Sequence, residues 1–138
     1  MDASSILPVP IPDEDSQHYW EVLGEGRFEL QRCHDCERWT WPPRPVCSGC
    51  HGENLYWEAP SGAGEVHAWI VTHQIYGPGY GALVPYTVAL VRLDEQPDIL
   101  VPGRYVSGGS LHQGLRVRIA PRQVDGGLGV PEWRSSVA

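Results

Sequence analysis

Two short cysteine motifs decide the fold of this chain: Cys33-His34-Asp35-Cys36 and Cys47-Ser48-Gly49-Cys50. Ten residues separate Cys36 from Cys47. This spacing lets two hairpin knuckles face each other and offer four thiolates in a tetrahedron, which is the ligand set of structural zinc. We therefore expect one structural Zn²⁺, held by Cys33, Cys36, Cys47 and Cys50.

A four-cysteine site leaves no open coordination position, so this zinc would hold the fold and activate no water. Two alternatives stay open. Iron in the same site would make the chain an electron carrier, and an oxidising compartment would pair the cysteines as disulfides. His34 and His51 lie beside the ligands, where we expect exposed knuckle residues.

Before the cysteines, residues 13–16 (Asp-Glu-Asp-Ser) predict the start of a helix, because they supply a capping side chain and acidic groups for its first turn. Tyr19, Trp20 and Leu23 give the expected helix, of about three turns, one aromatic face. Gly24 and Gly26 end it. Alternating apolar residues at 28–32 predict a short strand leading into Cys33.

After the cysteines, residues 60–64 (Pro-Ser-Gly-Ala-Gly) indicate a linker, and short strands separated by Gly and Pro follow. Strands are expected at residues 66–72, 86–93, 99–106 and 115–119. Val124 together with residues 130–133 is expected to complete the set. Five short strands without helical periodicity predict a small antiparallel barrel.

The chain is thus predicted to be mainly β and to have three parts. Residues 1–32 form an N-terminal arm, a helix and a lead-in strand. Residues 33–58 form the cysteine module, and residues 59–138 form the five-stranded barrel.

Composition excludes several function classes. The 138 residues carry a net charge of -7 and include no Lys. The acidity argues against a general nucleic-acid or anionic-membrane binder, and the absence of Lys excludes a Schiff-base lysine. No apolar run is long enough to span a membrane and no secretory signal is present, so we expect a cytoplasmic protein that contacts neither membrane nor nucleic acid.

The best candidate for a functional surface is the loop of residues 74–85, which connects the first two barrel strands. It carries Tyr76, Tyr80 and Leu83 on a glycine-rich backbone. Tyrosines of this kind are good anchors for a partner protein, and the alternative is a long loop whose tyrosines pack locally. Tyr19 and Trp20 on the helix are further interface candidates. We find no convincing catalytic constellation, because the cysteines are assigned to metal and His67, His73 and His112 lie singly.

The order of these parts resembles the DUF35 family of small proteins with an N-terminal helix, a rubredoxin-like zinc ribbon and a C-terminal OB-fold. The resemblance extends over about residues 15–125. Its residues are Tyr19-Trp20-Glu21, 26–33 (Gly-Arg-Phe-Glu-Leu-Gln-Arg-Cys), Pro42-Pro43-Arg44, the second cysteine motif, Trp57-Glu58, 61–66 (Ser-Gly-Ala-Gly-Glu-Val), Pro85-Tyr86, 88–91 (Val-Ala-Leu-Val) and 114–117. One position departs from the family: Glu37 follows Cys36 where the family usually has glycine.

The resemblance implies a non-catalytic accessory subunit of a thiolase-fold enzyme, either a thiolase or a side-chain-cleaving aldolase of the sterol-carrier type. Such complexes act on acyl-CoA or steroid-CoA thioesters, and a hot-dog-fold hydratase is a further partner. The subunit would stabilise the complex and share the CoA ligand, for which Arg104, Arg116 and Arg118 are candidate phosphate contacts. The alternative function is a single-stranded nucleic-acid-binding module, because zinc ribbons and OB-folds both serve that role elsewhere.

Overall fold

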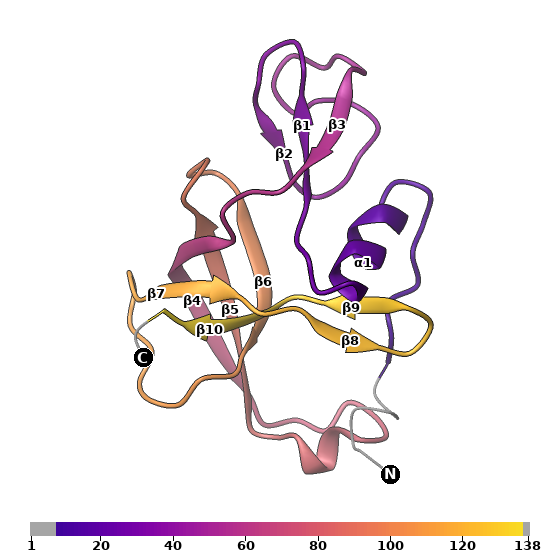
Figure 1. The fold of residues 1–138 in the computed structure, drawn as a ribbon. Helices are drawn as coiled ribbons and strands as arrows, with labels where there is room; N and C mark the ends of the chain where they lie inside the picture. Colours follow the sequence, from indigo (N-terminus) through magenta and orange to yellow (C-terminus); the bar gives the residue numbers. More distant parts are fainter. Residues whose placement is uncertain (1–7, 137–138) are drawn as a thin grey trace.

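The computed structural model describes residues 8–136 and contains a zinc-ribbon sheet, a short helix and a closed β-barrel (Figure 1). Residues 1–7 of the expected N-terminal arm lie outside the described residues. The helix α1 spans Gln17–Gly24. The strands are β1 (Leu30–Cys33), β2 (Trp39–Thr40), β3 (Leu55–Glu58), β4 (Ala63–Thr72), β5 (Tyr86–Leu93), β6 (Leu100–Tyr105), β7 (Arg116–Ile119), β8 (Arg122–Val124), β9 (Leu128–Val130) and β10 (Glu132–Ser135).

The ribbon sheet has the order β2-β1-β3, and β1 forms its centre. Both neighbours of β1 are antiparallel to it, with Gln31 opposite Thr40 on one side and Trp57 on the other. The strand expected to lead into Cys33 is therefore the middle strand of the ribbon.

The barrel closes in the order β10-β6-β5-β4-β7, and β7 returns to β4. All neighbours are antiparallel except β6 and β10, which run parallel. This five-stranded closed barrel confirms the predicted OB-like fold. A β-bulge at His67 shifts the register of β4 against β5.

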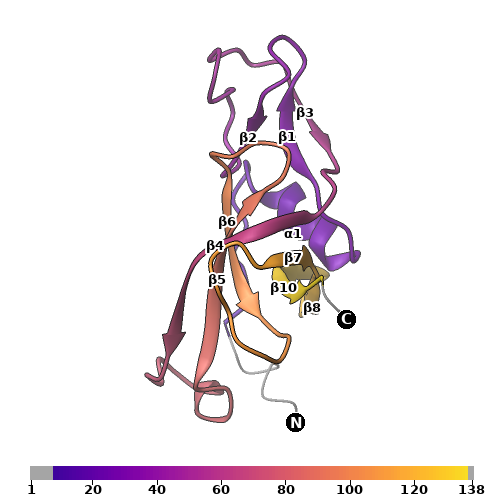
Figure 2. The same cartoon turned by 90° about the vertical axis from the view of Figure 1, so that its left-hand side faces the viewer.

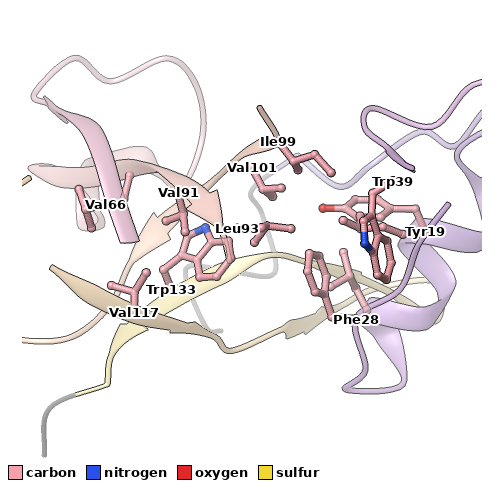
Figure 3. Close-up of a cluster of buried hydrophobic side chains, with 13 residues drawn as sticks. Tyr19, Phe28, Trp39, Val66, Val91, Leu93, Ile99, Val101, Val117 and Trp133 are labelled. Carbon is pink, nitrogen blue, oxygen red and sulfur yellow. The ribbon is translucent and has the colours of Figure 1, made fainter. Parts of the chain in front are cut away.

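Trp133 fills the centre of the barrel and is completely buried (Figure 3). Around it lie Val66, Val91, Val101 and Val117, each of them fully buried. The backbone of β6 passes very close to the indole, because a Cβ added at Gly103 would lie 2.8 Å from the Trp133 ring. Only glycine fits at that position.

The same hydrophobic core continues from the barrel to the helix and the ribbon (Figure 3). Phe28 meets Trp133 edge-on with 6.4 Å between ring centroids, and Tyr19 meets Phe28 at 6.3 Å. Leu30 and Trp39 join this cluster from the ribbon strands. The three parts of the chain thus share one core.

Two sequence-based expectations need correction. The helix has eight residues, just over two turns instead of three, because residues 14–16 form a preceding turn in which the Asp13 carboxylate accepts the Ser16 N–H at 2.8 Å. In addition, Val124 is not part of the barrel. It ends β8, which pairs with β9 in a separate hairpin, and only β10 closes the barrel.

The β8–β9 hairpin packs against α1 through glycines. A Cβ added at Gly24 would lie 2.2 Å from the Gly127 carbonyl oxygen, and one at Gly129 would lie 2.3 Å from the Leu23 carbonyl carbon. Gln123 Nε2 also donates to the Gly24 carbonyl at 2.7 Å. Backbone contact at these glycines fixes the helix beside the barrel.

The β4–β5 hairpin extends beyond the barrel at the end opposite the zinc ribbon (Figure 2). β4 pairs with β7 only at Ala63, Gly64 and Glu65, whereas its pairing with β5 continues to Thr72. The loop of residues 73–85 closes this hairpin, and Tyr80–Ala82 within it forms a 3₁₀ turn. No helix within residues 8–136 is long and apolar enough to cross a membrane.

Candidate metal centre and docking loop

The two cysteine knuckles bring their four sulfur atoms within 4.8 Å of one another. Cys33 Sγ lies 3.7 Å from Cys50 Sγ, and Cys36 Sγ lies 3.5 Å from Cys47 Sγ. A tetrahedral zinc ion with Zn–S bonds of about 2.3 Å requires sulfur atoms about 3.8 Å apart. The donor set and its spacing therefore fit one structural zinc ion, as the sequence predicts.

Backbone N–H groups point at the sulfur atoms in both knuckles. Asp35 N–H donates to Cys33 Sγ at 3.4 Å, and Gly49 N–H donates to Cys47 Sγ at 3.3 Å. The N–H groups of Cys50 and Gly49 lower the pKa of the Cys47 thiol to about 6, because they stabilise its thiolate. The backbone of the second knuckle thus favours the thiolate form of Cys47, whereas hydrogen bonds from the neighbouring cysteines and burial raise the pKa of Cys50.

Each knuckle ends in a residue with left-handed backbone. Glu37 has φ 66° and His51 has φ 63°. Glycine adopts this conformation most easily, which explains why the related family usually has glycine at position 37. The Glu37 N–H still donates to the Cys33 carbonyl at 2.9 Å, so the knuckle closes despite the larger residue.

The two histidines beside the cysteines, His34 and His51, are not metal ligands. His34 stacks on Tyr56 of β3 with 4.0 Å between ring centroids. His51 is exposed. Within residues 8–136 the four cysteines form the one cluster of side chains that could hold a metal ion, and neither histidine belongs to it.

The loop that the sequence singled out places its aromatic residues in a row. Tyr76 is 66% exposed and meets Tyr80 edge-on at 6.3 Å. Tyr80 in turn lies 6.1 Å from Tyr86 of β5. Tyr80, Leu83 and Tyr86 line a hollow of about 210 Å³ beside Arg104 and Glu132. Tyr80 thus packs on its aromatic neighbours, and Tyr76 at the end of the row is exposed.

The two helix aromatics differ from each other. Tyr19 is 1% exposed and its hydroxyl has no hydrogen-bond partner within residues 8–136. Burial raises the pKa of this phenol above its usual value. Tyr19 is therefore a core residue and offers no surface to a partner, contrary to expectation. Trp20 packs edge-on against Tyr19 at 5.0 Å and stays partly exposed.

The three candidate arginines do not form one anion site. Arg104 lies 3.2 Å from the buried Glu132 carboxylate, which Arg122 also contacts at 2.7 Å. Arg116 makes a two-bond ion pair with Asp94, with one contact of 2.8 Å, and this pairing lowers the pKa of Asp94. Arg118 donates only to the Ser61 carbonyl at 3.4 Å and has no carboxylate partner within residues 8–136. Of the three, its guanidinium is the one left without a counter-charge.

Sequence reasoning missed the exposed apolar end of β4. Trp69, Ile70 and Val71 are 40%, 64% and 50% exposed, although they lie in the middle of a strand-like apolar run. Together with Val88, Leu90, Pro102 and Ala68, Trp69 and Ile70 line a groove of about 230 Å³. No pattern in the sequence distinguishes this segment from a buried strand.

A zinc ribbon with a closed metal site, followed by an OB-type barrel, is the class of protein that this structure defines. Family comparison agrees in both parts: residues 20–55 match the model of "ChsH2, rubredoxin-like zinc ribbon domain", and residues 57–122 match "ChsH2, C-terminal OB-fold domain". The chain belongs to the DUF35 family of zinc-ribbon and OB-fold proteins.

Two curated proteins are similar in sequence. One is a "Probable enoyl-CoA hydratase alpha subunit" of Thermomonospora curvata, 27% identical over 133 residues, which are 96% of this chain. The other is a "DUF35 domain-containing scaffold protein" of Pyrococcus furiosus, 30% identical over 84 residues, which are 61% of this chain. The matches span 41% and 61% of the lengths of these two relatives.

Two solved structures share the fold. The first, titled "Ltp2-ChsH2(DUF35) aldolase", has a TM-score of 0.81 and 28% identity, and the match covers 94% of this chain and 100% of that chain. The second is a DUF35 protein of unknown function from Sulfolobus solfataricus, with a TM-score of 0.58 and 14% identity over 89% of this chain and 86% of that one. The second likeness concerns the fold alone.

Proposed function

We propose that this chain is an accessory subunit of a thiolase-fold enzyme, a thiolase or a side-chain-cleaving aldolase, that acts on acyl-CoA or steroid-CoA thioesters. The observation that carries the proposal is its similarity, over the whole length of the other chain, to the DUF35 chain in the aldolase structure. In this proposal the reacting groups belong to the partner, and this subunit stabilises the complex.

The division of the molecule into two ends supports this role. Four thiolates saturate the metal, so the ribbon has a structural task. The opposite end exposes Ile75 and Tyr76 at 60% and 66% on the hairpin loop, next to the exposed end of β4. Exposed aromatic and aliphatic residues that lie side by side are typical of a protein interface. We propose Tyr76, Tyr80, Leu83 and Trp20 as partner contacts.

The proposal further includes a CoA ligand that this subunit shares with its partner. Arg118 is its best phosphate contact, because Arg104 and Arg116 are already ion-paired with Glu132 and Asp94, whereas Arg118 has no carboxylate partner within residues 8–136. Calorimetry of the complex with CoA tests this: Arg118→Ala should weaken CoA binding, and an unchanged affinity would remove the arginine from the proposal.

The apolar groove on the barrel surface argues against the nucleic-acid alternative. None of its six lining residues is basic, whereas a single-strand binding groove tracks the phosphates with positive charge. The partner is therefore proposed to be a protein. The name of the Thermomonospora curvata relative makes a hydratase, proposed here with the hot-dog fold, the second partner to look for.

The test is a pull-down of the tagged, zinc-loaded chain from its native host lysate, with bound proteins identified by mass spectrometry. We expect a thiolase-fold or hydratase partner in stoichiometric amount. Tyr76→Ala with Tyr80→Ala should weaken binding of that partner about tenfold, since interface anchors contribute about 1–2 kcal/mol or more. Gln74→Ala, an exposed polar residue of the same loop, is the matched control and should bind normally.

Salt-sensitive recovery of nucleic acid in place of a protein would overturn the proposal. Equal binding by the double tyrosine variant would instead remove the loop from the interface and leave the accessory role standing.

A further inference from the structure

One edge of β4 is open over residues 68–72. On this side β7 covers Ala63, Gly64 and Glu65, and the N–H and C=O of Val66 bond to Leu115 and Gly114. Beyond the bulge at His67, the pairing of β4 continues only on its other side, with β5. Within residues 8–136 no strand pairs with the open edge.

The register identifies which backbone groups face this open edge. In an antiparallel ladder, every second residue bonds to one neighbour and the residues between bond to the other. Leu93 donates to Ile99, so residues 93, 91 and 89 of β5 bond toward β6, and residues 90, 88 and 86 bond toward β4. The β4 partners of these three are Ala68, Ile70 and Thr72. The N–H and C=O groups of Trp69 and Val71 therefore point away from β5, into the open edge.

The side chains beside this edge are apolar on both faces of the sheet. Trp69 and Val71 lie on one face and Ile70 on the other, and all three are at least 40% exposed. Proteins usually protect an open strand edge with Lys, Pro or a charged residue, and residues 68–72 contain none of these. A strand added beside this edge would have apolar neighbours on both faces. Strands in such surroundings are nearly continuous apolar runs.

We propose that the partner enzyme adds a strand to this edge: an extended, continuously apolar segment that hydrogen-bonds to the N–H and C=O groups of Trp69 and Val71. This inference rests on the proposed accessory function and specifies its contact. The edge is continuous with the proposed docking loop, because β4 runs directly into residues 73–76. Backbone bonds supply the pairing, and the groove at Ile70, Val88 and Leu90 accommodates side chains of the added strand.

Val71→Pro is the variant that separates the edge from the rest of the hairpin. Proline removes the N–H that points outward and leaves the bonds between β4 and β5 in place, because Val71 does not donate to β5. Val71→Ala is the matched control, since it shortens the side chain and keeps the N–H. Zinc content and thermal unfolding of both variants show that each is folded.

Binding is measured with the partner that co-purifies with the wild-type chain. We expect Val71→Pro to bind it at least tenfold more weakly than Val71→Ala does. In the wild-type complex, hydrogen exchange at the amides of Trp69 and Val71 should slow at least tenfold relative to the free chain.

The outcomes separate this inference from the proposed function. If the wild-type chain retrieves no thiolase-fold or hydratase partner, the proposed function fails and this contact fails with it. If the partner binds Val71→Pro and Val71→Ala equally, only the strand addition is overturned. If the isolated chain is a dimer by light scattering and Val71→Pro makes it a monomer, a second copy occupies the edge and the proposal is overturned.

Discussion

The zinc ribbon and the barrel are stabilised in different ways. Of residues 33–58 in the ribbon, only Cys33, Trp39, Thr40 and Cys47 are buried, and two of these four belong to the sulfur cluster. The barrel instead surrounds Trp133 with four fully buried valines. A segment too small to enclose its own core uses a metal, whereas the barrel relies on apolar contact. The contrast predicts that damage to one region acts through the metal and damage to the other through packing.

The largest effect is expected from Cys47→Ser. Four-thiolate zinc binding is coupled to folding with an apparent free energy of about 10 kcal/mol or more in zinc-finger peptides. The variant should lose zinc and become poorly soluble, as should Cys33→Ser. Metal analysis by mass spectrometry and the soluble yield check this. Ser48→Ala is the control, and normal zinc and solubility in both cysteine variants would contradict the assignment.

Trp133→Ala tests the barrel in the same way. Truncation of a completely buried tryptophan should lower the free energy of unfolding by about 3–5 kcal/mol, because it leaves a cavity in the barrel centre. The midpoint of urea unfolding measures this, and zinc content should remain one per chain. Loss of zinc in this variant would show that the two regions are one cooperative unit and would break the comparison.

Gly24→Ala tests the contact between the helix and the β8–β9 hairpin. The new Cβ would lie 2.2 Å from the Gly127 carbonyl oxygen, so the β8–β9 hairpin must move away. We expect a loss of about 1–3 kcal/mol, as for other overpacked sites. Gly108→Ala is the matched control, because a Cβ there has no atom within 4 Å. Thermal unfolding of the two variants should differ clearly; equal stability would mean that the hairpin adapts without loss.

Glu37→Gly should stabilise the ribbon alone. The residue has φ 66°, where glycine avoids the clash of a Cβ, and we expect a gain of about 0.5–1 kcal/mol. Competition with a zinc chelator measures it as tighter zinc retention. Glu37→Ala keeps the Cβ and should show no gain. An equal gain in Glu37→Ala would assign the effect to the carboxylate instead of the backbone.

The smallest effect concerns the Arg116–Asp94 ion pair on the barrel. Arg116 lowers the pKa of Asp94 in the folded state, so the pair stabilises the protein above the unfolded pKa, near 4, and this contribution is lost as the pH falls through the folded pKa. Both side chains are more than 40% exposed, which limits the contribution to a few tenths of a kcal/mol. Asp94→Asn should therefore be slightly less stable than wild type at pH 6 and equal to it below the folded pKa. A constant difference in the urea midpoint at both pH values would contradict this.

The metal centre was predictable because its information is local: four cysteines at fixed spacing define the ligands whatever surrounds them. The strands of the barrel followed from their Gly and Pro boundaries. The β8–β9 hairpin was missed although Asp125-Gly126-Gly127 is a turn signal, and both glycines there have positive φ. A turn predicted at these residues would have placed Val124 in a hairpin instead of in the strand that closes the barrel.

Exposure was the quantity that the sequence could not supply. Residue spacing put Tyr19 on an aromatic face of the helix but did not reveal that Trp41 and Phe28 cover it. Residues 69–71 have the composition of a buried strand, and they are uncovered on one edge because the neighbouring strand β7 begins only at Arg116, opposite Glu65. In both places the exposure of a side chain depends on which segment, distant in the sequence, packs beside it in the fold.

The closing strand also sets an order of events during synthesis. The ribbon sheet is complete at Glu58, whereas β10, which joins β6 to β7, begins only at Glu132. Chains emerge from the ribosome N-terminal end first, at about 5–20 residues per second. The knuckles therefore reach solution and can take their metal seconds before Trp133 emerges. During that interval the nascent barrel lacks the side chain that fills its centre. Zinc binding and barrel closure are therefore separate steps in the folding of the newly made chain.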